Sequence, residues 1–577
     1  MREQLTELRD IMRREGIDWY IVPSSDFHNS EYVHDYFKCR KYITGFTGSA
    51  GTAVIGGKEA WLWTDGRYFL QAAEELKDSG FGLMKQGQPG VPSIVEYLKQ
   101  QIQEADIAEG GRPLRIGFDG RVFTAAQAEE LMKLADTSEK KVEIVWDQDL
   151  VDEIWYNRPV ILPTAPKELP IQVTGRSTEQ KLKDIRRAMS SKEADWLVLT
   201  DLSEIAWTWN SRGRDIECTP VFYGYGLISQ KDARRFIMSD SSYEKFFDAL
   251  RGIPAGSSVW IDRSSASLAV FETLGKDVKV IDEPTPVGLL KAVKNRTELQ
   301  NFRYAHIKDG IAMVNFIYWL KSRIGSEHIT EMSAAEYLDN QRRNQEGCFD
   351  LSFPTIAGYG PHGAIVHYEA SMDTNAVLKP EGFLLVDSGG QYRDGTTDIT
   401  RTIALGPLTD KMKEYYTLVL KAHIALSSCR FQPGTTGSDL DAVTRKPLKD
   451  RGLDYNHGTG HGIGYILSVH EGPNIINPRN ELAYEPGMVT SDEPGVYIEN
   501  EFGIRLENVL VCEVQGDQYG FRPLTYCPFD RDAIIKDMLT ESELAWLNDY
   551  HKTVFSELRS HLAPEVRRWL EEATAEL

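Results

Sequence analysis

Two stretches of the chain repeat one pattern of apolar and polar positions, an amphipathic helix that leads directly into a strand. In each copy, apolar residues recur at the spacing of one helix face and a short apolar run follows. The copies stand at one constant, ungapped offset: Leu5, Leu8 and Met12 before residues 18–22, and Leu182, Ile185 and Met189 before residues 195–199. Helix-then-strand units occur in any α/β chain, but the constant offset and the Asp-Trp pair shared by both strand starts predict two related α/β domains.

A proline-rich segment separates the two copies. Residues 159–170 contain four prolines, which neither a continuous helix nor a central strand accommodates, so this segment is predicted to be a linker. A second boundary is expected near residues 282–286, because residues 294–320 follow with a long helical pattern. From about Thr540 apolar residues again recur at helical spacing, which predicts a terminal helical extension that packs on the last domain or on a second subunit.

These patterns predict an α/β (α+β) fold with three domains. We expect a first α/β domain over residues 1–158, a second over 159–294, and a catalytic domain with a C-terminal helical extension over 295–577. The length agrees with this division, because single hydrophobic cores stop growing beyond roughly 300 residues.

Composition and charge narrow the class of function. Hydrophobic residues make up 41% and charged residues 26% of the chain, as in ordinary globular proteins. No apolar run approaches the roughly 18 residues that span a bilayer, and residues 1–9 lack the apolar stretch of a secretory signal. The formal net charge of −21 argues against a nucleic-acid groove, which needs a dense basic face. Six scattered cysteines without a CxxC pair are expected to be buried, reduced thiols, which favours a cytoplasmic protein.

Two aspartates follow apolar segments in the last third of the chain. The apolar run over 383–386 is predicted to be a buried strand that ends at Asp387 and a glycine turn. A second turn signal, Asp394-Gly395, precedes another strand pattern that carries Asp398. Adjacent strands would bring Asp387 and Asp398 close together. Single aspartates at strand ends usually satisfy backbone donors, so this pair alone is weak evidence for a site.

Three further ionisable residues stand in segments that favour a site. His457 and His461 lie in a glycine-rich segment over 457–464, where the backbone can approach a bound group closely. Glu493 ends a strand pattern at Asp492-Glu493-Pro494-Gly495. Glu507 stands inside an otherwise apolar strand pattern over 503–511, where a carboxylate is costly to bury unless a cation or metal pairs with it.

Four carboxylates and one imidazole, here called the five-residue set, make an oxygen-rich group of metal ligands: Asp387, Asp398, His461, Glu493 and Glu507. One divalent ion cannot use all of them in an ordinary coordination shell, whereas two ions that share bridging carboxylates can, and paired metals are a standard device for hydrolysis. The oxygen donors favour manganese, with cobalt or zinc as alternatives in vitro. They do not suit a structural zinc site, which would use cysteines.

The order of the five-residue set resembles that of the metallopeptidases of the pita-bread fold, and within them the long, three-domain Xaa-Pro aminopeptidases of the cytosolic type. The resemblance extends over nearly the whole chain and rests on the five-residue set together with the segments 46–53, 62–69, 457–462, 492–495 and 546–551. It implies two creatinase-like α/β domains followed by a pita-bread catalytic domain. The implied activity is hydrolysis of the bond between an N-terminal residue and a penultimate proline.

The resemblance also implies a role for each member of the five-residue set. Asp387 would chelate one ion, and Asp398 and Glu507 would bridge both. His461 and Glu493 would complete the shell of the second ion. A hydroxide held between the metals would be the nucleophile, and Glu493 would take the proton from the attacking water and pass it toward the leaving nitrogen.

Substrate-binding residues are implied in the same way. His367 and His470 would act at the scissile bond by holding the peptide with hydrogen bonds, and His461 would also face the substrate. His457 would help to form the wall of the proline pocket. Arg505 lies two residues before Glu507, on the same strand face, where it could orient substrate or pair with a carboxylate. Arg67 in the first domain would reach a substrate residue, across a subunit contact; an arginine after Asp65-Gly66 is also an ordinary turn residue.

Four other interpretations compete with this one. A prolidase shares the metal ligands but cleaves only Xaa-Pro dipeptides, and the duplicated N-terminal region and C-terminal extension favour the aminopeptidase. A creatinase-like hydrolase would lack the carboxylates, and a catalytically silent binding protein on the same fold would not need them. Asp387-Ser388-Gly389-Gly390 also resembles the nucleophile loop of chymotrypsin-like proteases, which needs a β-barrel that this α/β pattern does not offer.

One departure from the family and two expectations about partners complete the sequence-based picture. Val496-Tyr497 stands where family members often carry two aromatic residues, so the wall of the substrate cleft is expected to differ there. The expected partners are peptides with a penultimate proline and a second copy of the chain in a homodimer, with the C-terminal domain at the contact. Neither nucleic acid nor a membrane is expected.

Overall fold

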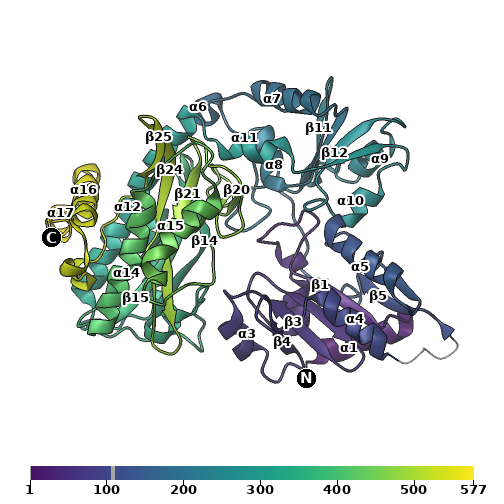
Figure 1. Cartoon of the computed structure of the whole chain (residues 1–577), viewed down its shortest axis with the longest axis horizontal. Coiled ribbons are helices and arrows are strands. Elements are labelled where there is room, and N and C mark those ends of the chain that lie inside the picture. The colour runs from purple at the N-terminus through teal and green to yellow at the C-terminus, as the bar shows by residue number, and fades with distance from the viewer. Residues whose placement is uncertain (1, 106–110) are drawn as a thin grey trace. The chain divides into compact units, whose positions relative to one another are not determined.

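The computed structural model describes residues 2–105 and 111–577. The chain forms two compact units, one of Met1–Glu168 with Ser177–Val287 and one of Leu169–Arg176 with Gly288–Leu577. Each unit is described by itself below. Figure 1 shows their helices and strands in order along the chain.

The first sheet of the N-terminal unit has the strand order β4-β3-β2-β1-β5-β6. Its strands are β1 (Trp19–Pro23), β2 (Thr52–Gly56), β3 (Ala60–Thr64), β4 (Gly82–Lys85), β5 (Leu114–Phe118) and β6 (Val142–Val145). The helices around it are α1 (Glu3–Glu15), α2 (Cys39–Thr44), α3 (Phe69–Glu75), α4 (Ile94–Glu104) and α5 (Ala125–Thr137). The apolar face of α1, with Leu5, Leu8 and Met12, is buried in one core with Tyr20 and Val22 of β1.

The second sheet of this unit has the order β11-β10-β8-β12-β13. Its strands are β8 (Trp196–Leu199), β10 (Gly224–Ser229), β11 (Ala233–Ile237), β12 (Ser258–Ile261) and β13 (Lys279–Asp282). The helices are α7 (Thr178–Ser191), α8 (Leu202–Thr208), α9 (Lys245–Arg251) and α10 (Leu268–Glu272). Helix α7 leads into β8 as α1 leads into β1, so the two predicted helix-then-strand units are both present.

The proline-rich segment has almost no regular structure. Only Lys167–Glu168 forms a short strand, β7, which pairs with β9 (Ser211–Arg212). The linker prediction therefore agrees with the local structure. Exposed apolar side chains lie along and just before it, with Val160 at 73% and Leu162 at 80% exposure.

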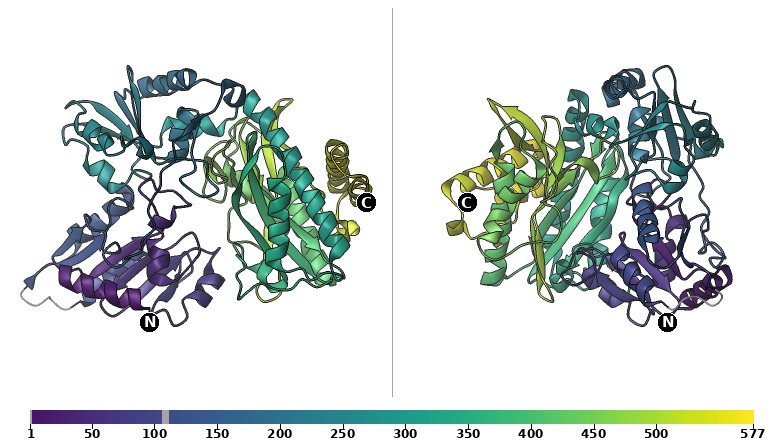
Figure 2. Two further views of the ribbon diagram at one scale, coloured as in Figure 1. Left: turned by 180° about the vertical axis from the view of Figure 1, so that it is seen from behind. Right: turned by 45° about the vertical axis from the view of Figure 1, so that its right-hand side comes forward.

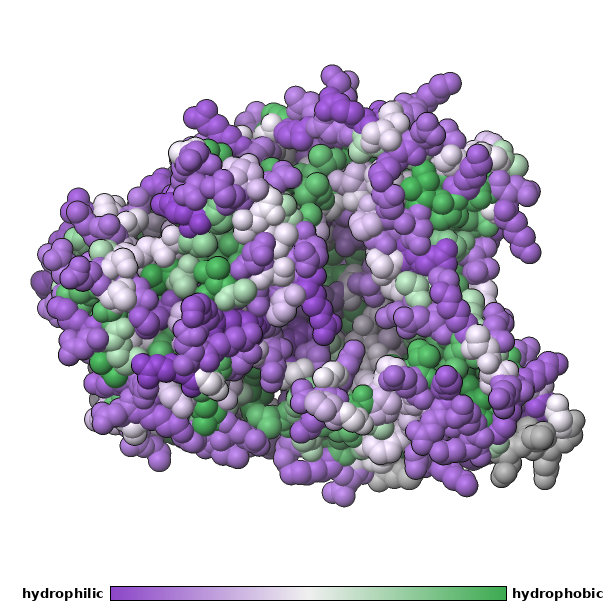
Figure 3. Space-filling view, in the orientation of Figure 1, coloured by the Kyte–Doolittle hydropathy of each residue, from purple (hydrophilic) through white to green (hydrophobic). Residues whose placement is uncertain are grey.

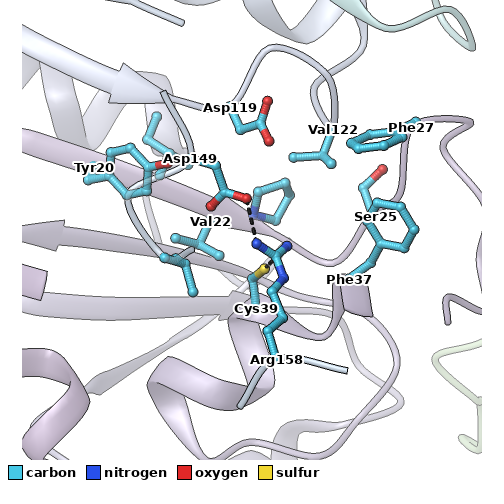
Figure 4. Close-up of a pocket in the computed structure, with 13 residues that line it drawn as sticks. Tyr20, Val22, Ser25, Phe27, Phe37, Cys39, Asp119, Val122, Asp149 and Arg158 are labelled. Atoms are coloured by element: carbon cyan, nitrogen blue, oxygen red, sulfur yellow. Dashed lines mark hydrogen bonds and ion pairs between the residues drawn. The ribbon is translucent and has the colours of Figure 1, made fainter. Parts of the chain in front are cut away.

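A small cavity lies at the end of the first sheet, shown in Figure 4. Its volume is about 20 Å³, which is room for one or two water molecules. Arg158 closes it: one guanidinium nitrogen donates to Asp149 at 2.7 Å and another lies 3.1 Å from the sulfur of Cys39. Burial raises the pKa of the Cys39 thiol to about 12, so this cysteine is an inert packing residue rather than a reactive thiol.

The C-terminal unit has two main sheets and the helices that cover them. One sheet has the order β14-β15-β16, with β17 also paired to β15, and the other has the order β18-β25-β24-β21-β19-β20. The first sheet contains β14 (Cys348–Tyr359), β15 (Phe383–Tyr392), β16 (Gly395–Thr396) and β17 (Ile399–Ala404). The second contains β18 (Arg430–Phe431), β19 (Gly460–Gly462), β20 (Glu471–Ile476), β21 (Val489–Asp492), β24 (Asn508–Gln515) and β25 (Gln518–Pro523). A separate hairpin pairs β22 (Gly495–Ile498) with β23 (Phe502–Arg505).

Long helices lie against these strands, and two more lie outside them at the C-terminal end, as Figure 2 shows. The helices are α6 (Ile171–Thr174), α11 (Pro286–Ala292), α12 (Arg296–Arg323), α13 (Glu331–Arg343), α14 (Asp410–Ser427), α15 (Gly437–Lys449), α16 (Glu541–Leu558) and α17 (Pro564–Ala573). Met313 and Phe316 of α12 share a buried core with Leu384 and Val386 of β15. The predicted terminal extension is therefore present as α16 and α17, packed on α12 and α14.

The visible surface is mostly polar. Hydrophilic side chains cover most of the face seen in Figure 3, with hydrophobic residues in small groups between them. Among the described residues, none of the helices has the length and apolar character needed to cross a membrane.

Three local expectations differ from the structure. Asp387 lies within β15, not at its end, because the strand continues through the glycines to Tyr392. Glu507 lies between β23 and β24 rather than inside one long strand, because the chain passes from the hairpin to the second sheet at that point. Of the six cysteines, three are buried (Cys218, Cys512 and Cys527), and the other three are partly exposed.

Candidate metal centre

Two antiparallel strands hold the first two members of the five-residue set. Asp387 in β15 pairs in register with Thr400 in β17, and Asp398 comes just before β17 begins. Asp398 and Thr400 are two residues apart, so their side chains point to the same face. That face also receives Asp387, and both aspartates are buried.

His461 comes from β19 of the other sheet. Its Nε2 lies 3.4 Å from a carboxylate oxygen of Asp398 and 3.4 Å from one of Glu493. The other ring nitrogen, Nδ1, lies 2.9 Å from the carbonyl oxygen of Gly462 and donates to it. This hydrogen bond directs Nε2 at the carboxylates, so the ring offers the Nε2 lone pair to a metal ion once that nitrogen loses its proton.

Glu493 and Glu507 complete the cluster. Glu493 directly follows β21, and its Oε1 accepts a hydrogen bond from Ser491 at 3.2 Å. The Oε2 of Glu507 accepts one from Thr400 at 2.7 Å, and its backbone N–H donates to the Thr400 carbonyl. Candidate ligand atoms of Asp398, His461 and Glu507 all lie within 4.8 Å of one another. The structure therefore brings the five-residue set together from both sheets.

Arg505 lies in the same cluster, bonded to one of its carboxylates. Its side chain is buried and donates to Asp387 at 2.6 Å, to the Tyr497 hydroxyl at 2.8 Å and to the Thr400 hydroxyl at 3.2 Å. Of the two roles considered from the sequence, this geometry favours pairing with a carboxylate. Tyr497 was noted only as a departure from the family pattern, yet it is a direct partner of Arg505.

Burial and mutual repulsion raise the pKa values of carboxyl groups in the cluster. Burial raises the pKa of Glu493 to about 7, and the negative charges of Asp398 and Asp387 add to this rise against the opposing effect of His461. Burial together with Asp398 and Glu493 raises the pKa of Glu507 well above its ordinary value. For His461, burial alone would lower the pKa, but the contact with Asp398 and the charge of Glu493 raise it to about 9. Such a cluster is costly without positive charge inside it.

The cluster fits divalent metal ions in two further respects. The Oδ1 atom of Asp387 is buried and has no hydrogen-bond partner among the residues that the structure describes, so one strong acceptor is left for a cation. The donors are four carboxylates and one imidazole, a set that binds Mn²⁺, Co²⁺ or Zn²⁺. A pair of divalent cations would balance the four negative charges.

The raised pKa values predict how metal binding depends on pH. In the metal-free folded protein Glu493 holds its proton up to about pH 7, whereas the unfolded glutamate releases it near 4.5. The contribution of Glu493 to the stability of the metal-free fold is therefore complete below that lower value and is lost as the pH rises through about 7. Metal ions need the deprotonated ligands, so the difference in melting temperature between metal-loaded and chelated protein should grow from about pH 5 to about pH 8. Thermal melts across this range check it, and a pH-independent difference would contradict it.

The three remaining histidines lie around the cluster. His470 packs edge-on against His461, with ring centroids 4.4 Å apart. His457 accepts a hydrogen bond from the Tyr497 hydroxyl at 2.8 Å and lies 4.0 Å from Glu493. His367 follows Val366, whose carbonyl accepts a hydrogen bond from Arg505 at 3.3 Å, so the loop of His367 borders the cluster.

Arg67 lies in the N-terminal unit, after β3. Its guanidinium forms two hydrogen bonds of 2.9 Å with Asp65 and lies 3.7 Å from Glu31. Burial alone would lower the pKa of Arg67, but the contact with Asp65 raises it above the ordinary value. This is the turn arrangement considered from the sequence, and a role of Arg67 toward substrate stays a prediction.

Glu331, at the start of α13, holds the loop that carries His367. Its side chain is fully buried and accepts hydrogen bonds from the backbone N–H of Tyr359 at 2.7 Å and of Ala376 at 2.8 Å. It also contacts His362 at 2.8 Å and accepts from the Tyr368 hydroxyl at 2.9 Å. The sequence analysis missed this residue, because a glutamate in the first turn of a helix is an ordinary feature.

Replacing Glu331 with glutamine should loosen this loop without removing a member of the five-residue set. One carboxylate oxygen becomes an N–H₂ group that faces backbone donors, which costs about 1–3 kcal/mol. We expect a higher KM for peptide and unchanged metal affinity, measured by steady-state kinetics and metal titration. Glu336→Gln on the exposed face of the same helix is the matched control. An unchanged KM would show that the loop is held without Glu331.

Comparisons with known proteins cover the whole chain. Residues 300–513 match the model of metallopeptidase family M24, and residues 517–577 match the C-terminal region of peptidase M24. Residues 4–151 and 157–298 each match a creatinase/prolidase N-terminal domain.

Full-length relatives carry one name. The chain is 38% identical over 605 residues to the probable Xaa-Pro aminopeptidase P of Laccaria bicolor, covering 98% of this chain and 92% of that one. It is 36% identical over 615 residues to the protein of the same name in Talaromyces marneffei, covering 100% and 92%. Among solved structures it is similar to the X-prolyl aminopeptidase of Caenorhabditis elegans, described as a cytosolic enzyme with a di-nuclear active site, with a TM-score of 0.92, 32% identity and coverage of 100% and 99%.

Proposed function

This chain belongs to the Xaa-Pro aminopeptidase P family, and we propose that it removes the first residue from peptides whose second residue is proline. One observation assigns the proposed activity to particular residues. Side chains from two sheets converge into one cluster, and these are Asp387, Asp398, His461, Glu493 and Glu507. The chain is a metal-dependent exopeptidase with these five side chains as the ligands of two divalent ions. The oxygen-rich donors favour Mn²⁺ among the candidates.

Metal ions bound there would polarise the scissile carbonyl and lower the pKa of a bound water toward ~7. Glu493 is the residue that takes and returns a proton. Its carboxylate lies 3.4 Å from His461, inside the cluster where the attacking water would be held, so it is near enough to accept a proton.

The remaining residues hold the substrate. His367 and His470 border the cluster and donate hydrogen bonds to the peptide near the scissile bond, and His461 faces the substrate from within the cluster. His457 and Tyr497 form one wall of the proline pocket, linked by the hydrogen bond between them. Arg505 opposes the rise that burial causes in the pKa of Asp387 and orients its carboxylate, and Arg67 reaches a substrate residue across a subunit contact.

A peptide bond to proline explains why such a site is needed. The proline nitrogen is a tertiary amide without an N–H, and its ring fixes the backbone, so enzymes that grip an extended backbone fit it poorly. A site that recognises the rigid ring by shape, and activates the carbonyl with metal ions, avoids this limit. The free amine of the first residue then lies near the metal ligands, which makes the enzyme an exopeptidase.

Cleavage of Arg-Pro-Pro against an Arg-Pro dipeptide tests the proposal. The manganese-loaded protein should release arginine from the tripeptide, and chelation should abolish this release. A protein that cleaves the dipeptide and ignores the tripeptide would be a prolidase instead. A metal-loaded protein inactive on both peptides would be a binding protein on this fold.

Three finer features belong to the same proposal. The protein acts in the cytoplasm and forms a homodimer through its C-terminal domain, where α16 and α17 add helical surface. The domains extend over residues 1–158, 159–294 and 295–577. Size-exclusion chromatography with light scattering tests the dimer, and limited proteolysis near residues 159 and 295 tests the boundaries.

A further inference from the structure

Arg401 is a buried arginine directly behind the five-residue set. It lies in β17 next to Thr400, so its side chain leaves the strand on the face opposite the cluster. Only 1% of its surface is exposed. Its Nη1 donates to the backbone carbonyls of Thr400 at 3.0 Å and Glu507 at 2.6 Å. Arg401 therefore holds the backbone of Glu507, a predicted metal ligand, from the side of the strand opposite the cluster.

The other donors of Arg401 reach the segment that leads into the C-terminal extension. Nη2 donates to the carbonyl of Cys527 at 2.7 Å and to the Tyr550 hydroxyl at 3.0 Å, and Nε donates to the carbonyl of Pro528 at 3.1 Å. The guanidinium also lies 4.3 Å from the centre of the Phe529 ring. Among the described residues no carboxylate pairs with it, so its hydrogen bonds go to neutral oxygens. A buried cation held in this way joins chain segments rather than balancing one acid.

Tyr550 brings helix α16 into this arrangement. Besides accepting from Arg401, its hydroxyl lies 2.9 Å from the carbonyl of Cys527, to which it donates. Trp546 stacks parallel to its ring at 5.4 Å, and His551 accepts a hydrogen bond from the N–H of Phe529. Helix α16 itself packs on α12 and α14, outside the two sheets (Figure 1). Through Tyr550, helix α16 of the C-terminal extension therefore contacts Arg401, the residue that holds the backbone of Glu507.

A second path leads from Arg401 to Glu493. Asn508 accepts from Arg401 Nη2 at 2.8 Å and donates through its amide nitrogen to Nε2 of His423 at 3.2 Å. Nδ1 of His423 then donates to the carbonyl of Asp492, the residue before Glu493, at 3.1 Å. All of these residues are buried. The orientation of Asn508 is fixed at both ends, and so is the tautomer of His423.

We propose that the C-terminal extension positions the metal ligands Glu507 and Glu493 through Tyr550, Arg401 and Asn508. Arg401 and Tyr550 are positioning residues, because neither faces the substrate side of the cluster. The C-terminal extension then helps to hold the metal ligands in position, in addition to enlarging the surface of the domain. The inference rests on the proposed function, since it takes the five-residue set to be the metal ligands.

The test compares two buried tyrosines. Tyr550→Phe removes the hydroxyl that bonds Arg401, and Tyr20→Phe removes a hydroxyl in the N-terminal unit that donates to the Gln148 carbonyl at 2.8 Å and accepts from the Leu150 N–H at 3.0 Å. Both variants lose the hydrogen bonds of one buried tyrosine hydroxyl, so both should melt at a lower temperature. Only Tyr550→Phe should weaken Mn²⁺ affinity, by about tenfold in calorimetric titration, the lower end of what outer partners of metal ligands contribute.

A second variant tests the same set of hydrogen bonds in case the loss of the Tyr550 hydroxyl alone changes metal affinity too little to measure. Arg401→Lys keeps the charge but loses the planar fork that joins the segments, so it should weaken Mn²⁺ affinity and kcat more than Tyr550→Phe does, with KM little changed. Mn²⁺ affinities equal to wild type in both Tyr550→Phe and Arg401→Lys would overturn the proposal. Absence of Mn²⁺ binding in the wild-type protein would instead overturn the proposed function, so the two failures are distinguishable.

Discussion

Glu507→Gln is expected to lower kcat/KM for Xaa-Pro-Xaa peptides by at least about a thousandfold. The amide keeps the size of the side chain but loses the negative charge that both metal ions would share. Loss of several kcal/mol of transition-state stabilisation corresponds to this factor, since each 1.36 kcal/mol is tenfold in rate. Metal content should fall below two ions per chain in the same sample.

The melting temperature of metal-free Glu507→Gln, unlike its activity, should not fall. Burial, Asp398 and Glu493 raise the pKa of Glu507, so folding without metal costs free energy either to bury this charge or to protonate the carboxyl group. The neutral amide removes this cost, and the chelated variant should melt no lower than chelated wild type. Glu501→Gln, in the exposed turn of the nearby hairpin where Glu501 pairs with Lys411, is the matched control and should keep full activity. Full activity of Glu507→Gln would contradict the assignment.

Arg505→Met is expected to lower kcat/KM by about a hundredfold while both metal ions remain bound. The variant loses the charge-assisted bond to Asp387 and the bond to Tyr497, and bonds to charged groups contribute about 1.5–3 kcal/mol each. Metal affinity should not weaken, because removal of a buried cation leaves the cluster more negative. A mutation in a metal ligand would give the reverse pattern, with low affinity as the cause of low activity.

Melting temperatures separate this effect from unfolding. Chelated Arg505→Met should melt well below chelated wild type, since breaking a buried ion pair costs about 3–5 kcal/mol. Metal loading should restore most of the difference by supplying positive charge beside Asp387. Arg522→Met, whose half-exposed guanidinium in β25 pairs with Glu513 in β24, is the control. Loss of metal from Arg505→Met would contradict the role given to Arg505.

Much of the fold could be predicted from the sequence because its signals are local. The repeat of Leu5, Leu8 and Met12 as Leu182, Ile185 and Met189 reflects one helix face against one strand, and the structure contains both units. The five-residue set was found because buried carboxylates and glycine-rich segments are rare in apolar surroundings. Thr400 was within reach of the same reasoning, since it lies two residues after Asp398 and shares its strand face.

The partners behind the site could not be predicted, because they are assembled from distant segments. In the sequence, Arg401 is a single charged residue in a strand pattern. Nothing near it indicates that Tyr550, far along the chain, accepts a hydrogen bond from it. Glu331 likewise reads as a helix-start residue, although it holds a loop more than twenty residues away. The break between β23 and β24 at Glu507 was missed because apolar residues continue on both sides of it.

Metal content against activity in one sample tests the central claim most directly. Metal-free protein is titrated with Mn²⁺, and bound metal per chain and cleavage of Arg-Pro-Pro are measured at each step. The account predicts that activity rises with bound Mn²⁺ and reaches its plateau at two ions per chain. Full activity in the metal-free protein, or a protein that binds no divalent ions at its five-residue set, would contradict it.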